Sequence, residues 1–212
     1  MIGKSKAPAV AALVLGLLAT SLTSAVAAAQ TIPPSSDPVA MTVDPTTTAL
    51  VVQDLSETPC GPQANCRTLL LPVASLLTSA RDAGVLVLFT TPNTREAILP
   101  EVAPMDDETF FPGRGQDRFY NTPLDDILQA HGISTVILVG WRANGSILYT
   151  SFDAANRGYT VVVPIDGTSA GQDFEVAIGR YQMLNHASAN ATNQPLKPGA
   201  VTLSQTDLIS FG

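Results

Sequence analysis

Short apolar runs alternate along most of the chain with longer segments whose apolar residues recur at helical spacing. The continuous runs predict buried strands, because a strand covered on both faces is apolar on both. They cover residues 49–52, 85–91, 135–139, 159–164 and 200–203. The periodic segments predict helices over residues 67–83, 123–132, 146–157 and 173–187. Three of these helices run into a glycine, a common C-terminal stop: Gly84, Gly132 and Gly158.

The alternation of strands and helices predicts an α/β fold around one mostly parallel sheet with helices on both faces. In such sheets ligands bind beyond the carboxyl ends of the strands. Two segments occupy that position, namely Gln53–Asp54 after the first predicted strand and residues 140–146 after the third. We therefore expect a functional site to combine these two segments.

The N-terminus has the pattern of a cleaved secretory signal. Lys4 and Lys6 precede an apolar run over residues 7–22, and small residues with Ala-x-Ala spacing follow over residues 24–30. A membrane anchor is the alternative, but the run is shorter than the roughly 20 residues that span a bilayer. No basic stop-transfer cluster follows it. The sequence thus predicts a secreted or periplasmic protein.

Cleavage after Ala27 or after Ala29 fits the pattern equally well. We assign residues 1–29 to the signal peptide, residues 30–46 to an extended lead-in rich in Pro, Ser and Thr, and residues 47–212 to one domain. No later segment is apolar for long enough to span a membrane, so no membrane association is expected after cleavage.

Charge and cysteine content narrow the classes of partner. The net charge of −7 argues against nucleic acid, which selects basic surfaces. Cys60 and Cys66 lie close together in a loop with Gly and Pro, and in an oxidising compartment such a pair predicts a disulfide. Two cysteines and two distant histidines are too few for a typical metal site, so we expect neither metal nor cofactor.

Two residues at the strand ends could carry chemistry. Asp54 follows a buried strand, so partial desolvation could raise its pKa and suit it to acid or base catalysis. The alternative is a structural Asp that caps a turn. Ser146 lies where a helix begins, near backbone N–H groups that favour an anion, although it or Asn144 could simply cap that helix. The segment lacks the Gly-x-Ser-x-Gly motif of the α/β-hydrolases.

The order of several short motifs resembles a known family. They are residues 49–54, Ala83-Gly84-Val85, residues 119–124, the strand into Gly140, and residues 150–154 followed by Arg157-Gly158-Tyr159. In this order they resemble the isochorismatase-like hydrolases, also called cysteine hydrolases, over roughly residues 47–170. The resemblance implies a three-layer Rossmann-like sandwich, a small-molecule substrate and a possible homo-oligomer.

The resemblance also implies site residues. The family's amidases use an Asp, a Lys and a nucleophilic Cys, and the Asp falls on Asp54. The Lys position falls at about Gly113, where Arg114 is the nearest basic residue and the expected anchor for an anion. The Cys position falls on Ser146. The chain therefore lacks the family's Lys and Cys.

The loop before Ser146 is implied to bind substrate through Trp141, Arg142 and Asn144. Family members carry a non-proline cis peptide bond in this loop, which falls here near Trp141–Arg142. The nicotinamidases of the family hold a metal on an Asp-x-His motif, which this sequence lacks.

Two catalytic routes and one non-catalytic role remain open. Ser146 could attack the substrate as a nucleophile, or Asp54 could act alone as a general acid, as in family members that hydrolyse isochorismate. The second route is preferred from the sequence, because no His or Lys stands at a recognisable position to activate the hydroxyl. The loss of both Lys and Cys would also suit a catalytically inactive protein that binds a ligand or assembles with a partner.

Overall fold

The computed structural model describes residue 3 and residues 36–92, 96–186 and 190–212. The predicted signal peptide, residues 1–29, therefore lies outside the described residues except for Gly3. No helix within the described ranges is both long enough and apolar enough to cross a bilayer.

A seven-stranded sheet forms the centre of the fold, and all of its strand pairings are parallel. The strand order is β4-β3-β2-β5-β6-β8, and β7 pairs with the end of β5. The strands are β2 (Thr48–Gln53), β3 (Leu86–Thr91), β4 (Thr109–Pro112), β5 (Thr135–Trp141), β6 (Thr160–Pro164), β7 (Thr168–Ser169) and β8 (Val201–Ser204). The central strand β2 lies between β3 and β5, which places its carboxyl end in the middle of one sheet edge.

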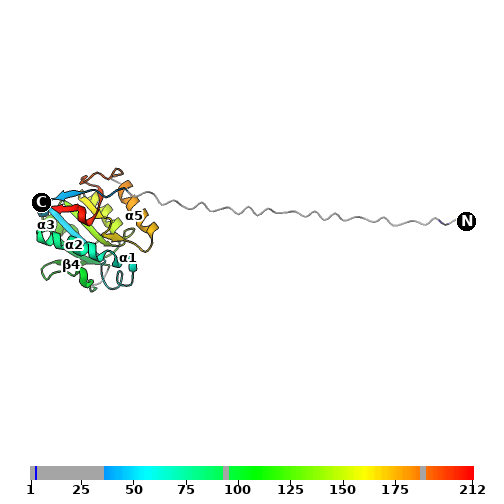
Figure 1. Ribbon diagram of the computed structural model, residues 1–212, viewed down its shortest axis with the longest axis horizontal. Coiled ribbons are helices and arrows are strands. Elements are labelled where there is room, and N and C mark those ends of the chain that lie inside the picture. The colour runs from blue at the N-terminus through cyan, green and yellow to red at the C-terminus, as the bar shows by residue number, and fades with distance from the viewer. Residues whose placement is uncertain (1–2, 4–35, 93–95, 187–189) are drawn as a thin grey trace. The chain divides into compact units, whose positions relative to one another are not determined.

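Helices cover both faces of this sheet (Figure 1). Alternate side chains of a strand point to opposite faces. Leu50 and Val52 therefore pack in the cluster that contains α2 (Leu70–Asp82). Ala49 and Val51 pack in the cluster that contains residues of α3, α4 and α5. These helices are α3 (Leu124–Ala130), α4 (Ser146–Asn156) and α5 (Asp173–Asn185). The predicted three-layer α/β fold with a parallel sheet is confirmed.

A second, two-stranded sheet joins the two ends of the described domain. β1 (Met41–Val43) pairs in parallel with β9 (Ile209–Phe211), and the two strands lie side by side in Figure 1. The sequence analysis assigns residues 30–46 to a lead-in outside the domain, but β1 belongs to the fold. Each of these strands is too short to show a clear period, and each depends on a partner from the other end of the chain.

The remaining elements are short. They are α1 (Ala64–Arg67) and the 3-10 helices η1 (Pro45–Thr47), η2 (Pro100–Val102) and η3 (Thr206–Leu208). The segment between β3 and α3 contains η2 and the edge strand β4.

The ends of β2 and β5 approach each other closely. Gly140 has a φ of +126°, and a Cβ at this position would overlap the backbone oxygen of Gln53. Only glycine tolerates both conditions. This approach brings Asp54, which follows β2, beside the loop that follows β5.

Candidate active site

Asp54 lies directly beyond β2, and only 5% of its surface is exposed. Its backbone adopts a left-handed conformation with a φ of +59°, a region in which Asp is enriched among residues other than glycine. Its N–H donates to the backbone oxygen of Thr90 on β3 at 2.9 Å. The carboxylate is therefore held at the carboxyl end of the sheet, where the sequence analysis expects it.

Ser146 is the first residue of α4 and is buried. Its Oγ lies 2.8 Å from Asp54 Oδ2 and 2.7 Å from the backbone oxygen of Trp141. A hydroxyl has one proton, so it donates to one of these two acceptors at a time. If Asp54 is ionised, it can accept this proton. If Asp54 is protonated, it can donate to Ser146 Oγ, and the hydroxyl can then donate to Trp141.

The basic group beside Asp54 is Arg118, which is 1% exposed. Its Nη2 donates to both carboxylate oxygens of Asp54, and its Nη1 donates to the backbone oxygen of Gly115. The backbone N–H of Arg118 donates to Thr150 Oγ1 at 3.1 Å, which ties the segment to α4. The sequence analysis expects Arg114 to be the cation of the site, but Arg114 lies on the exposed surface. The cation beside Asp54 is Arg118, four residues further along the chain.

The protonation of Asp54 is set by opposing effects. Burial raises the pKa of the Asp54 carboxyl above its ordinary value, while the Arg118 guanidinium and the Ser146 hydroxyl act in the opposite direction. Burial disfavours the charged form, and a cation or hydrogen-bond donor favours it. Asp54 is thus suited to exchange a proton with a neighbouring group.

A cavity of about 330 Å³ opens onto Asp54 and Ser146. The β5–α4 loop contributes Trp141 and Arg142, and the segments after β3 and β4 contribute Pro92 and Gln116. The remaining wall comes from the segment after β2 and is made of Thr58, Pro59 and Gln63. The volume is in the range of small-molecule sites.

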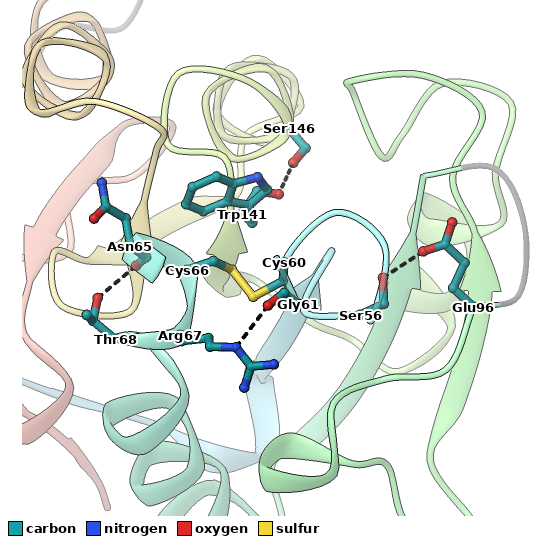
Figure 2. The surroundings of a disulfide bond; sticks show 10 residues. All are labelled: Ser56, Cys60, Gly61, Asn65, Cys66, Arg67, Thr68, Glu96, Trp141 and Ser146. Carbon is teal, nitrogen blue, oxygen red and sulfur yellow. Dashed lines mark hydrogen bonds between the residues drawn. A yellow bond between two sulfur atoms is a disulfide. The ribbon is translucent and has the colours of Figure 1, made fainter. Parts of the chain in front are cut away.

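The segment after β2 that forms this last wall contains a disulfide between Cys60 and Cys66, whose Cα atoms are 5.4 Å apart. Both cysteines are fully buried and belong to the same apolar cluster as Trp141. Figure 2 shows this disulfide near Trp141, whose backbone oxygen accepts the hydroxyl of Ser146. The expected disulfide is confirmed, and it lies in the segment that lines one side of the cavity.

Of the three residues expected to bind substrate, two line the cavity and Asn144 does not. Trp141 and Arg142 line the cavity, and the peptide bond between them is cis, which confirms the prediction from the family resemblance. Arg142 Nη2 donates to both carboxylate oxygens of Glu175 on α5, at 2.7 and 2.8 Å.

Sequence reasoning missed Arg118 and the polar wall residues. Arg118 stands directly before Phe119, one of the residues that carry the family resemblance, but that resemblance places the family's Lys at about residue 113 and implies Arg114 instead. Thr58, Gln63 and Gln116 lie in irregular segments without a motif. The close pair of cysteines was the available signal that the segment after β2 is held in place.

No group of three or more His, Cys, Asp or Glu side chains within the described ranges could hold a metal ion. The geometry of Asp54 and Ser146 is compatible with proton transfer between the two side chains.

Comparison with curated proteins found partial matches. The uncharacterized isochorismatase family protein YaaI of Bacillus subtilis is 27% identical over 97 residues, which is 46% of this chain and 54% of that protein. The ureidoacrylate amidohydrolase RutB of Methylorubrum extorquens is 33% identical over 72 residues, which is 34% of this chain and 29% of that protein. This chain therefore spans about half or less of these relatives.

Solved structures share the fold over a greater length. A cysteine hydrolase from Pseudomonas syringae pv. phaseolicola matches with a TM-score of 0.67 and 21% identity, over 81% of this chain and 95% of that one. The model of the Isochorismatase domain matches residues 48–192, which include Asp54, Arg118 and Ser146. The chain belongs to the isochorismatase family.

Proposed function

We propose that the protein is an exported hydrolase of a small molecule, in which Ser146 is the nucleophile and Asp54 is its general base. The observation that carries this proposal is the distance of 2.8 Å between Ser146 Oγ and Asp54 Oδ2 at the edge of a cavity. A nucleophile within hydrogen-bond reach of a base, with the base held by a third group, is the arrangement that activates a hydroxyl. Arg118 is the third group.

The reaction begins with ionised Asp54. Asp54 takes the hydroxyl proton while Ser146 Oγ forms a bond to the carbonyl carbon of the substrate. Asp54 then returns the proton to the leaving nitrogen or oxygen, whose bond to the carbonyl carbon breaks. Water attacks the resulting acyl-enzyme, Asp54 takes a proton from that water, and Ser146 regains its proton as the acid product leaves.

The negative charge that develops on the carbonyl oxygen needs hydrogen-bond donors. Ser146 is the first residue of α4, so its backbone N–H has no acceptor within the helix. The positive end of the helix dipole lies at the same place. These groups favour the tetrahedral intermediate over the planar substrate.

Arg118 has a positioning role in this scheme. A guanidinium stays protonated at ordinary pH, so it does not relay protons. Its contact with both carboxylate oxygens orients Asp54 and favours the ionised form that a base requires.

The contact between Ser146 and Asp54 favours the nucleophilic route over the general-acid route. The general-acid route is preferred from the sequence because no His or Lys stands at a recognisable position to activate the hydroxyl. The hydrogen bond between Ser146 Oγ and Asp54 Oδ2 supports Asp54 as the base in place of a His or Lys. The name of RutB, an amidohydrolase, supports a substrate with a cleavable C–N bond.

Export remains part of the proposal. It rests on the N-terminal sequence pattern and is supported by the disulfide, because disulfides persist mainly in oxidising compartments.

One observation favours a second candidate, a binding protein without catalytic activity. Both carboxylate oxygens of Asp54 accept hydrogen bonds from Arg118, and a carboxylate satisfied in this way is a weaker base. Under this alternative the cavity would hold a small molecule without converting it.

The test is an assay of the purified mature protein against small amides, esters and enol ethers, with Asp54→Asn as the variant. Asp126→Asn is the matched control, because Asp126 is exposed on α3 and lies outside the cavity. Loss of a general base typically costs ~100-fold to 10,000-fold in rate, so Asp54→Asn should lose that much while the control keeps its activity. Thermal unfolding of both variants checks that they are folded. Ligand binding without turnover in the wild-type protein would favour the binding protein.

A further inference from the structure

Part of the cavity wall lies in the turn that the Cys60–Cys66 disulfide closes. Thr58, Pro59 and Gln63 line the same cavity as Trp141 and Arg142 of the β5–α4 loop, and the disulfide joins the two sides of the turn that contains Gln63. This wall is separate from Asp54, Arg118 and Ser146, the residues assigned to the chemistry.

Several contacts hold this wall in one conformation. The disulfide is fully buried, and Arg67 Nε donates to the backbone oxygen of Gly61 at 2.9 Å (Figure 2). Asn65 Nδ2 donates to the backbone oxygen of Ala170, beyond β7, at 3.2 Å. A surface fixed before the ligand arrives loses little conformational entropy on binding.

The polar side chains of this wall are uncharged and available. Thr58 and Gln63 are both exposed. In the described part of the chain, the hydroxyl of Thr58 and the side-chain amide of Gln63 have no hydrogen-bond partner in the protein. Arg142, the cation that lines the cavity, is already paired with Glu175. The carboxylate of Glu175 offsets the charge of Arg142, so little net positive charge faces a carboxylate on the substrate. A neutral amide or hydroxyl could bind Gln63 and Thr58 directly.

We infer that Gln63, with Thr58, binds an uncharged polar group at the end of the substrate remote from Ser146, and that the Cys60–Cys66 disulfide fixes this wall for binding. The inference deepens the proposed hydrolase function and rests on the same cavity. It assigns Gln63 to substrate specificity, and it distinguishes neutral polar substrates from those with a carboxylate at the remote end.

The test compares two ligands of matched length, the neutral diamide succinamide and the anionic monoamide succinamate. Their affinities are measured by calorimetry on Ser146→Ala, so that turnover plays no part. We expect the diamide to bind at least about 10-fold more tightly, and Gln63→Leu in the same background to remove most of that preference. Ala64→Ser is the control, because Ala64 is an exposed neighbour that does not line the cavity.

A second arm tests the disulfide with Cys60→Ser/Cys66→Ser in the same background. The diamide should bind about 10-fold more weakly, while circular dichroism at low temperature shows a folded protein. Equal affinity for the two ligands, including no detectable binding of either, would overturn the inference, as would an unchanged preference in Gln63→Leu. A preference for the diamide without hydrolysis in the wild-type protein would support the inference and contradict the hydrolase function.

Discussion

The guanidinium of Arg118 occupies the space into which any side chain at Gly113 would project. A Cβ on Gly113 would overlap Arg118 Nη1 and would lie 2.9 Å both from Arg118 Cζ and from the backbone oxygen of Pro92. The absence of a side chain at residue 113 is therefore what admits the guanidinium to Asp54. The family resemblance implies a Lys at about residue 113, so the cation of the site enters here from a different position in the same loop.

Gly113→Ala tests this relationship directly. The added methyl group should displace Arg118 from Asp54, and overpacking of this kind costs typically 1–3 kcal/mol, so we expect a loss of about 2 kcal/mol in unfolding free energy. Activity should fall with it. Gly115→Ala is the matched control, because the nearest atom to a Cβ there is 3.8 Å away on Tyr120. Urea unfolding that gives the same stability for both variants would contradict the close packing of residues 113 and 118.

Arg118→Met should be strongly destabilising, because it leaves the buried Asp54 without its cation. Breaking a buried ion pair typically costs about 3–5 kcal/mol, much of it from the unpaired charge. The double variant Arg118→Met/Asp54→Asn should recover part of that loss, since no buried charge then remains. A double-mutant cycle by urea unfolding measures this coupling, and strictly additive losses would show that the two side chains are energetically independent.

The same variant should change the pH dependence of activity. Arg118 lowers the pKa of Asp54, so its removal should raise that pKa. A general base is active when ionised, and the acidic limb of the kcat/KM profile should therefore move to higher pH in Arg118→Met. A shift to lower pH would indicate that Asp54 is not the base.

Cys60 and Cys66 should be oxidised to each other in the exported protein. Thiol titration of unreduced, denatured protein should find no free thiol. Because the closed loop is short, the bridge should contribute roughly 2 kcal/mol to stability, measured by unfolding Cys60→Ser/Cys66→Ser beside the oxidised wild type. Two free thiols in exported protein would contradict the bridge.

Asp117, the neighbour of Arg118, should make stability depend on pH. Burial raises its pKa to about 6, and the nearby Asp153 adds to the shift. A carboxyl with a raised pKa in the folded state binds its proton more tightly there than in the unfolded chain. Its contribution to stability is thus present at low pH and is lost as pH rises through about 6.

Asp117→Asn should remove this contribution while keeping an oxygen to accept the N–H of Phe119, which Asp117 Oδ1 accepts at 2.9 Å. The gain in unfolding free energy between about pH 7 and about pH 5 should be smaller in Asp117→Asn than in the wild type. Asp126→Asn should behave as the wild type. The same pH dependence in all three proteins would assign the titration to another group.

The parts of the fold that depend on local pattern were predictable from the sequence. β2, β3, β5 and β6 are apolar on both faces, so continuous runs mark them clearly. β1, β4, β7 and β9 are short, and β1 is stabilised by β9, from the opposite end of the chain. Pairing over such a separation leaves no periodic signal in either segment.

In the candidate site, too, some residues could be predicted from the sequence and others could not. Asp54 and Ser146 stand at the ends of predicted elements, so the rule for ligand positions in parallel sheets finds them. Arg118 lies in an irregular loop, and its contact with Asp54 depends on the free space at Gly113. Space of this kind arises from packing in three dimensions, which the spacing of residues along a chain does not record.

The most direct test of Ser146 as the nucleophile is kcat/KM of Ser146→Ala on the substrate that the wild-type protein hydrolyses best. Removing a nucleophile typically costs ~1,000-fold or more, and we predict a loss of that size with the fold retained. A loss below about 10-fold would contradict the nucleophilic role and leave Asp54 as a general acid acting alone.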